Sequence, residues 1–383
     1  MPVKRTILIS GMIAADPWQG GATWAVLQYV LGLRQLGHEV YLVEPLSRER
    51  LREGQALGSS ENANYFASIV NEFGLSRYSA LLVKGTNETC GLSYHQLQKI
   101  ARRADVLINI SGMLTDENLL RSIPIRVYLD LDPAFNQLWN TVEGVDMRFT
   151  GHTHFVTIGL QIGEPGCAVQ TCGLTWLKTL QPIVLEHWQT AAQVGYDAFT
   201  TVGNWRGYGS IQHEGVHFGQ KAHSLRQFLD LPALTHESFV LALSIHPDET
   251  KDLAALARNG WQLIDPTRVA GSPGAYRNFI QASKAEFGIA KSGYVASHCG
   301  WFSDRSACYL ASGRPVIAQD TGFSRYLPTG EGLFAFTTSE EVVQAAEEVR
   351  TDYNKHASQA RSLAEEYFDS AKVLPKLLQH IGA

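Results

Sequence analysis

The sequence predicts an α/β protein built from two doubly wound domains, and three observations support that fold class. The chain opens with a strand, a helix and a strand over residues 6–43, and a second alternation of strands and helices begins at Tyr196. Residues 292–328 then read as strand, glycine turn, helix and strand, which is one unit of a parallel sheet. A length of 383 residues is sufficient for two hydrophobic cores.

The first half of the chain contains a series of short apolar runs that we expect to be strands. Residues 6–10 form the first, and a helix with Trp24, Leu27 and Val30 at helical spacing follows and ends at Gly37. We expect further strands at 38–43, 80–83, 105–110, 126–131 and within 149–157, and helices at 64–73 and 94–103. Residues 182–193 read as a linker leading into a helix, so the domain boundary is expected near residue 190.

The second half repeats the alternation. The expected strands cover 196–202, 239–245, 261–264, 293–297, 316–318 and 334–337. The expected helices cover 249–258, 276–287, 304–312 and a long run from Ser339 to Tyr367, with a terminal amphipathic helix at 371–380.

The composition excludes several classes of protein. A formal charge of −5 without a basic block argues against a nucleic-acid partner, and no segment reaches the length of a membrane span. The five cysteines include no CxxC motif, so we expect no metal site and a reduced, cytoplasmic setting. The oligomeric state cannot be predicted from these features.

The glycine-containing turn at residues 298–303 has the features of an anion site. Ser303 and Asp304 occupy the N-cap region of the helix at 304–312, where free N–H groups and the positive end of the helix dipole meet. Arg305 lies in the first turn, and a guanidinium group matches phosphate geometry. The alternative interpretation is an ordinary capped helix of an α/β protein.

Three short motifs surround this turn, namely HCGWFS, the GRP turn and QDTG. Together they resemble the nucleotide-sugar box of the GT-B glycosyltransferases, most closely that of the plant-type UDP-glycosyltransferases. The match is partial, because the helix has no ribose-binding glutamate and the GRPV turn falls two residues later. The resemblance implies two Rossmann-like domains that face each other across a cleft. It also implies an acceptor domain at 1–190, a nucleotide-sugar domain at 191–365 and a terminal helix at 366–383 that crosses back to the first domain.

The resemblance also implies a set of donor-binding residues. His298, Gly300 and Ser303 would hold the diphosphate with Asp304 and Arg305, and Gln319, Asp320 and Thr321 would face the sugar. The loop after the strand at 196–202 often contacts the donor in this family, which makes Asn204 and Arg206 candidates. Glu286, just before the turn, is a further candidate.

The acceptor side is expected in the first domain. Asp16 is the only ionisable residue of the loop at 11–21 and is a candidate general base, although an aspartate before Pro17 is also typical of a turn. Asp130 ends a predicted strand, and His152 and His154 would point the same way on another, so Asp130 and His152 are alternative catalytic groups. The two histidines can equally be loop residues that bond only to backbone. Trp18, Gly20, Gly21 and His154 are the expected acceptor contacts.

The leading hypothesis is a hexosyltransferase that moves a sugar from a nucleotide-diphosphate donor, with UDP as the expected nucleotide, to a small molecule or glycan. We expect it to be metal-independent and to need no cofactor besides the donor. A GT-B-like sugar-nucleotide epimerase remains open, as does a non-catalytic two-lobed protein that binds nucleotides or carbohydrates.

Overall fold

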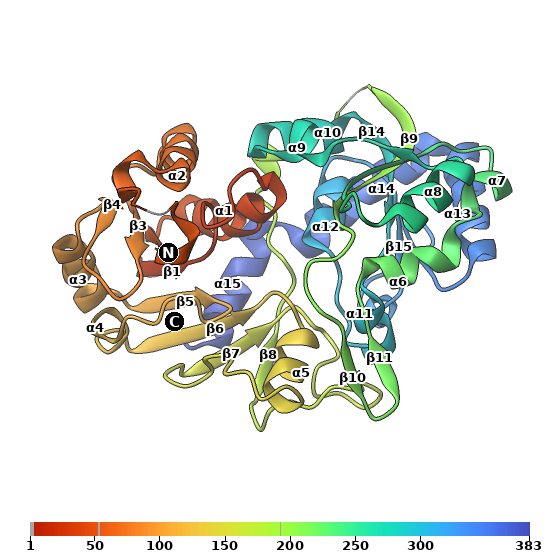
Figure 1. The fold of residues 1–383 in the computed structure, drawn as a ribbon. Helices are drawn as coiled ribbons and strands as arrows, with labels where there is room; N and C mark the ends of the chain where they lie inside the picture. The colour runs from red at the N-terminus through yellow and green to blue at the C-terminus, as the bar shows by residue number, and fades with distance from the viewer. Residues whose placement is uncertain (1–3, 53, 192) are drawn as a thin grey trace.

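The computed structural model describes residues 4–52, 54–191 and 193–383. Two parallel sheets lie in separate halves of the molecule, and both chain ends lie with the first half (Figure 1). Each sheet is covered by helices, which is the architecture that the alternating pattern predicts.

The first sheet has the order β4-β3-β2-β1-β5-β6-β7-β8, and only β4 runs antiparallel to its neighbour. Central strands are apolar because helices cover both faces of the sheet. Its strands are β1 (Thr6–Ser10), β2 (Glu39–Leu46), β3 (Ser79–Val83), β4 (Thr89–Gly91), β5 (Val106–Ile110), β6 (Ile125–Asp130), β7 (His154–Thr157) and β8 (Trp176–Lys178). Its helices are α1 (Gly20–Gln35), α2 (Glu61–Glu72), α3 (Tyr94–Arg103), α4 (Glu117–Leu120) and α5 (Phe135–Thr141).

The second sheet has the order β13-β12-β9-β14-β15-β16 and is parallel throughout, with a separate antiparallel hairpin, β10-β11. Its strands are β9 (Tyr196–Asn204), β12 (Phe239–Ser244), β13 (Gln262–Leu263), β14 (Ser283–Gly288), β15 (Val316–Gln319) and β16 (Leu333–Phe336), and the hairpin is β10 (Ile211–His213) and β11 (Val216–Phe218). Its helices are α6 (Lys221–Leu225), α7 (Leu231–Leu234), α8 (Thr250–Arg258), α9 (Pro266–Ala270), α10 (Pro273–Ala282), α11 (Ser292–Ser297), α12 (Asp304–Ala311), α13 (Ser339–Thr351) and α14 (Tyr353–Leu363).

The last helix, α15 (Ser370–His380), packs against α1 of the first half. A side chain on Gly32 would collide with Leu374 and Ser370, so the two helices approach closely at this glycine. The bonds Ile183 N–H to Phe368 O and Ser370 N–H to Ile183 O bring the start of this helix to the segment between the two sheets. Trp188 of that segment is fully buried and stacks edge-on against Trp24 of α1.

Two secondary-structure predictions around the central turn were wrong. The predicted helix at 276–287 is α10 followed by the central strand β14, which the charged residues Lys284 and Glu286 disguise in the sequence. Lys284 pairs with Glu237, and Glu286 is fully buried against Arg305. The predicted strand at 293–297 is the short helix α11, because a short apolar run fits either element.

Two further predictions differ from the structure in the segment between the sheets and before β7. The described residues of 182–193, which leave out 192, contain a 3₁₀ turn at Leu185–His187 instead of the expected helix. His152 precedes β7, so it does not share a strand face with His154. The last strand of the first sheet ends at Lys178 and the first strand of the second begins at Tyr196, and the division at residue 190 stays a prediction.

Candidate functional site

A cleft of about 640 Å³ lies between the two halves of the molecule. It is large enough for a ligand the size of a nucleotide sugar. One wall comes from Pro17 to Tyr29 with Leu131 and Ile158, and Gln181 and Pro182 contribute from the connecting segment. The opposite wall comes from the second half: Val202, Gly203, Asn204, Ser244, Pro266, Thr267, Ala270, Tyr276, Lys291, Asp304 and Arg305.

The second wall is formed where parallel strands end. Asn204 and Ser244 are the last residues of the neighbouring strands β9 and β12, and α12 begins at Asp304. The carboxyl ends of parallel strands are the usual position of ligand sites in such sheets. Ser303 caps α12, since its hydroxyl oxygen accepts the Arg305 N–H at 3.2 Å. Because Asp304 and Arg305 line the cleft, the positive end of the helix dipole faces it.

Arg305 is anchored but retains hydrogen-bonding capacity. Its Nε–H donates to Glu286 Oε1 at 2.5 Å, and its Nη1 donates to the carbonyl of Val202 at 2.8 Å. A guanidinium group has five N–H donors, so three remain. The side chain is 7% exposed and lines the cleft, so these donors can serve a bound anion.

Lys221 is a buried ammonium group without a protein partner in the described parts of the chain. The residue is 8% exposed, and its Nζ lies 2.8 Å from the position that a Cβ on Gly203 would occupy. Burial holds the pKa of Lys221 well below its usual range, and the nearby Arg305 lowers it further. A buried cation without a counter-ion is costly, which is typical of a group that pairs with a ligand.

The first wall is the start of α1 and the loop before it. The carboxylate of Glu44 accepts hydrogen bonds from the N–H groups of Ala14 at 2.8 Å and Ala15 at 2.6 Å. These bonds hold the loop in place. Burial raises the pKa of Glu44 to about 7, although these N–H groups oppose the shift. A side chain on Gly20 would collide with Ser272 O, so α1 touches the second half at its first residue.

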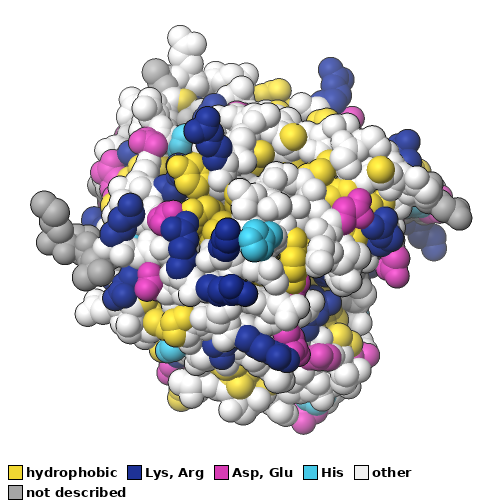
Figure 2. All heavy atoms as spheres, turned by 90° about the vertical axis from the view of Figure 1, so that its left-hand side faces the viewer, with side chains coloured by type: hydrophobic (Ala, Val, Ile, Leu, Met, Phe, Trp, Pro, Cys, Tyr) yellow, Lys and Arg dark blue, Asp and Glu magenta, His cyan; other side chains and the backbone are white. Residues whose placement is uncertain are grey.

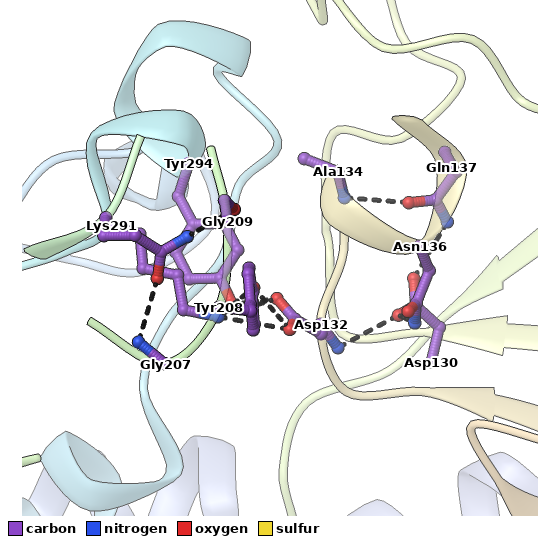
Figure 3. Close-up of polar contacts among 11 residues, drawn as sticks. Asp130, Asp132, Ala134, Asn136, Gln137, Gly207, Tyr208, Gly209, Lys291 and Tyr294 are labelled. Carbon is purple, nitrogen blue, oxygen red and sulfur yellow. Dashed lines mark hydrogen bonds and ion pairs between the residues drawn. The ribbon is translucent and has the colours of Figure 1, made fainter. Parts of the chain in front are cut away.

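A buried polar cluster joins the two halves beside the cleft (Figure 3). Lys291 Nζ lies 3.1 Å from both carboxylate oxygens of Asp132, and it also contacts the hydroxyls of Tyr208 and Tyr294. Asp132 follows β6 of the first half, whereas the other three residues belong to the second. Burial lowers the pKa of Lys291 and Asp132 opposes this shift. Every ammonium hydrogen of Lys291 therefore has an acceptor within the protein.

Six of the predicted site residues line the cleft: Trp18, Gly20, Gly21, Asn204, Asp304 and Arg305. Glu286 and Ser303 lie directly behind it, as the partner of Arg305 and the cap of α12. Arg206 instead pairs with Glu249. The roles assigned to these residues stay predictions.

The three predicted catalytic groups lie outside the cleft lining. Asp16 is adjacent to it and accepts a hydrogen bond from Gln19 at 2.6 Å. Asp130 is fully buried, its pKa is raised by burial to about 6, and its oxygens accept bonds from Asn136, Gln137 and Thr157. These bonds leave Asp130 badly placed to take a proton from a substrate.

The two histidines bond to residues of the first half. His152 Nε2 lies 3.0 Å from the Asn109 amide nitrogen and its Nδ1 lies 3.2 Å from Phe149 O, while His154 Nδ1 contacts Thr153 Oγ1 at 2.9 Å. Both histidines bond to side chains, so the interpretation as loop residues that bond only to backbone was wrong, and their catalytic and acceptor roles stay predictions.

The glycine-containing turn at residues 298–303 faces a loop of the first half instead of the cleft. Gln161 N–H donates to Cys299 O at 3.0 Å, and the Gln161 amide donates to Gly322 O at 3.1 Å. A side chain on Gly300 would meet the Gln161 backbone at 2.7 Å. His298 is exposed, and Gln319, Asp320 and Thr321 also lie outside the cleft lining. Cys299, Gly300 and Gly322 therefore contribute to the contact between the halves.

Sequence reasoning missed two tyrosines of the cleft lining and the lysine behind it. Tyr29 and Tyr276 lie on helices in patterns that read as core, and Lys221 follows a polar loop that carries no recognisable motif. The position of Lys221 soon after the predicted glycine loop at 203–207 was the one available signal, because only the hairpin β10-β11 separates them in the sequence.

The comparisons with solved structures concern the whole chain. An alpha-glucosyltransferase in complex with UDP-glucose and DNA is 13% identical, with a TM-score of 0.61 and 98% of each chain covered. The HepE protein of Anabaena, in complex with UDP and glucose, is 12% identical, with a TM-score of 0.61 and 99% of each chain covered. A glycosyltransferase from Rickettsia africae is 13% identical, with a TM-score of 0.55 and coverage of 99% and 98%.

No protein-family model and no curated protein matches the sequence. The structural likenesses confirm the predicted fold class, because the chain has the two-domain GT-B fold over its whole length.

The sequence-based exclusion of nucleic acid was wrong. Several solved structures with this fold are alpha-glucosyltransferases bound to DNA. A net charge describes the whole chain and says little about one face of it. Figure 2 shows Lys and Arg side chains gathered on the side of the first half where α3 lies. Lys99, Arg102 and Arg103 of α3 are exposed.

No helix in residues 4–52, 54–191 and 193–383 is long and apolar enough to cross a membrane. Within the same residues, no group of three or more His, Cys, Asp and Glu side chains could hold a metal ion.

Proposed function

We propose that the protein transfers a hexose from a nucleotide-diphosphate donor to an acceptor that enters beside α1. The observation that carries the proposal is the pairing of an unpartnered buried ammonium group with a partly free guanidinium group at the start of α12. Arg305 lines a largely apolar cleft, and the buried Lys221 lies directly behind its wall, beside the lining residue Gly203. The shared fold with structures that hold UDP or UDP-glucose supports the choice of donor.

The chemistry of such a transfer requires stabilisation of the departing diphosphate. Preorganised cations in a site that excludes water supply this stabilisation, because they need no reorientation as charge develops. The three free N–H donors of Arg305, the ammonium group of Lys221 and the N-terminus of α12 are placed for that role. In the proposal these groups replace a metal ion as the counter-charge.

The acceptor would lie against Trp18, Gly20 and Gly21, the predicted acceptor contacts that line the cleft. Trp18 is 53% exposed and adopts a left-handed backbone conformation with φ of 66°, which a bulky residue rarely does without a local constraint. Its indole N–H donates to Glu61 at 2.7 Å, so the ring is held in place. Asp16, which precedes Pro17 and Trp18, remains our candidate base for a reaction that inverts configuration.

The test is calorimetric titration with UDP, dTDP, GDP and ADP of the wild-type protein and of Lys221→Met. Loss of a charge-assisted contact should weaken binding of the preferred nucleotide by about 1.5–3 kcal/mol, or roughly 10- to 150-fold in Kd. Lys251→Met is the matched control, because it removes an exposed lysine on α8 away from the cleft. Absence of binding by all four nucleotides, or equal affinity in Lys221→Met, contradicts the proposal.

Turnover is then measured by NMR with the matching nucleotide sugar and an acceptor panel of glycans, aromatic alcohols and duplex DNA. The panel includes DNA because several structures of this fold contain it. Formation of a new glycosidic bond supports the transferase. Interconversion of the donor sugar without an acceptor supports an epimerase, and binding without turnover supports the binding protein.

A further inference from the structure

Tyr29 lines the cleft, and its buried phenolic hydroxyl has no partner among the described residues. Tyr29 is 2% exposed, lies in the cleft-facing row of α1 with Ala22 and Ala25, and its Oη makes no hydrogen bond to another described group. A buried hydroxyl without a partner costs free energy, so native structures rarely retain one without a use. Because Tyr29 lines the cleft, a ligand that packs against this side chain is the partner that could satisfy the hydroxyl.

Asp304 faces the same end of the cleft from the other half of the molecule. Its carboxylate lies close enough to raise the pKa of the Tyr29 hydroxyl, after burial, which is the larger cause. Burial also raises the pKa of Asp304 itself. Both side chains line the cleft, so a ligand between α1 and the start of α12 would meet a hydroxyl on one side and a carboxyl group on the other.

This pair suits neutral hydroxyl groups and does not suit phosphate. A carboxylate repels phosphate, whereas it accepts hydrogen bonds readily from alcohols. A tyrosine hydroxyl both donates and accepts, so it matches an alcohol in either direction. Arg305 of the same wall and Lys221 behind it are the groups that suit the diphosphate of the donor.

We infer that Tyr29 and Asp304 form the subsite that recognises hydroxyl groups of the transferred sugar, with Tyr29 as a specificity-determining residue from the opposite domain. This inference rests on the proposed function. It implies that the donor sugar is bound from both halves, whereas the nucleotide is bound mainly by the second.

Tyr29→Phe isolates the inference because it removes only the oxygen. Calorimetric titrations with UDP and with UDP-glucose are compared for the wild type and Tyr29→Phe, together with unfolding temperatures. We expect UDP affinity to be unchanged and UDP-glucose affinity to fall about fivefold, the range of one neutral hydrogen bond. The unfolding temperature should be unchanged or higher, because no protein contact is lost.

Tyr128→Phe is the matched control. Tyr128 is fully buried, and its hydroxyl also lacks a partner among the described residues, but it lies on β6 away from the cleft lining. The control should leave both affinities unchanged. Equal losses for UDP and UDP-glucose in Tyr29→Phe, or no loss for either, overturn the sugar subsite while leaving the proposed function intact. If wild-type protein binds neither ligand, the proposed function fails as well, so the two failures are distinguishable.

Discussion

Two clusters of charged and hydroxyl groups lie at the cleft, and they differ in how far the protein satisfies them. In the first, Lys291 has four acceptor oxygens around its ammonium group, from Asp132, Tyr208 and Tyr294. In the second, the Tyr29 hydroxyl has no partner among the described residues. Lys221, behind the cleft wall, makes no side-chain hydrogen bond to them, and Arg305 uses two of its five donors.

The difference separates a structural role from a binding role. A lysine whose three hydrogens are all accepted has nothing left to offer a ligand, although it lines the same cleft. A buried group with unused donors costs free energy in the free protein and recovers it when a ligand binds. Charge does not distinguish the two lysines, whereas their hydrogen-bond partners do.

The largest expected effect is a loss of stability when the cluster of Lys291, Asp132, Tyr208 and Tyr294 is disrupted. Asp132→Asn and Lys291→Met each leave a buried partner unpaired, so each should lower the free energy of unfolding by about 3 kcal/mol in urea denaturation. The side chains are 25% and 19% exposed, which is low enough for the pair to retain much of this energy. The double variant should lose less than the sum of the two. Nucleotide affinity of the folded variants should stay within about twofold, since Lys291 has no free donor.

The result that contradicts this assignment is specific. If Lys291→Met keeps its stability and loses nucleotide affinity tenfold, Lys291 belongs to the donor site, and its pairing with Asp132 does not make it structural.

The sequence predicted the regular elements well where the pattern is local. The strand at Thr6–Ser10 and the helix at Tyr94–Arg103 have the bounds that the periodicity gives. β14 was missed because Lys284 and Glu286 are compensated by Glu237 and Arg305, which lie far away in the sequence. A strand whose charges are neutralised only in the folded protein cannot be recognised from its own residues.

The candidate site was predictable only in part for a similar reason. Asp304 and Arg305 were found because a capped helix after a glycine turn has a local signature. The same signature does not say what the turn faces, and here Gly300 faces Gln161 of the first half. Tyr29 reads as core from its spacing, because a helix row that faces a cleft and one that faces a core have the same period.

A smaller effect tests the turn that joins the halves. Gly322 has φ of 96°, and a side chain there would collide with the Gln161 amide, so Gly322→Ala should cost about 2 kcal/mol of stability. Gly85→Ala is the matched control, since Gly85 has φ of 73° but nothing within 4 Å of a new Cβ. Urea denaturation should show a larger loss for Gly322→Ala, with nucleotide affinity unchanged in both. A tenfold loss of affinity in His298→Ala would instead restore the turn as the diphosphate site.

The smallest expected effect is a proton taken up on binding, and it follows from the unpaired state of Lys221. Burial, Arg305 and Lys291 lower the pKa of Lys221 in the free protein, whereas the carboxylates of Glu286 and Asp304 raise it. The result is a pKa well below the usual range. A diphosphate beside the ammonium group favours its charged form, so the pKa rises when nucleotide binds. Between the lowered and the raised pKa, each binding event therefore takes up as much as about one proton, and affinity falls as pH rises through that window.

The measurement is calorimetry at about pH 8, two units above the second pKa of a phosphate group, so that the nucleotide itself contributes little. Titrations in Tris and in HEPES, whose ionisation enthalpies differ, give the number of protons from the difference in observed enthalpy. Lys221→Met should abolish the uptake, whereas Lys291→Met should retain it, because Asp132 already pairs with Lys291 in the free protein. Uptake that disappears in Lys291→Met and persists in Lys221→Met would reverse the roles of the two lysines.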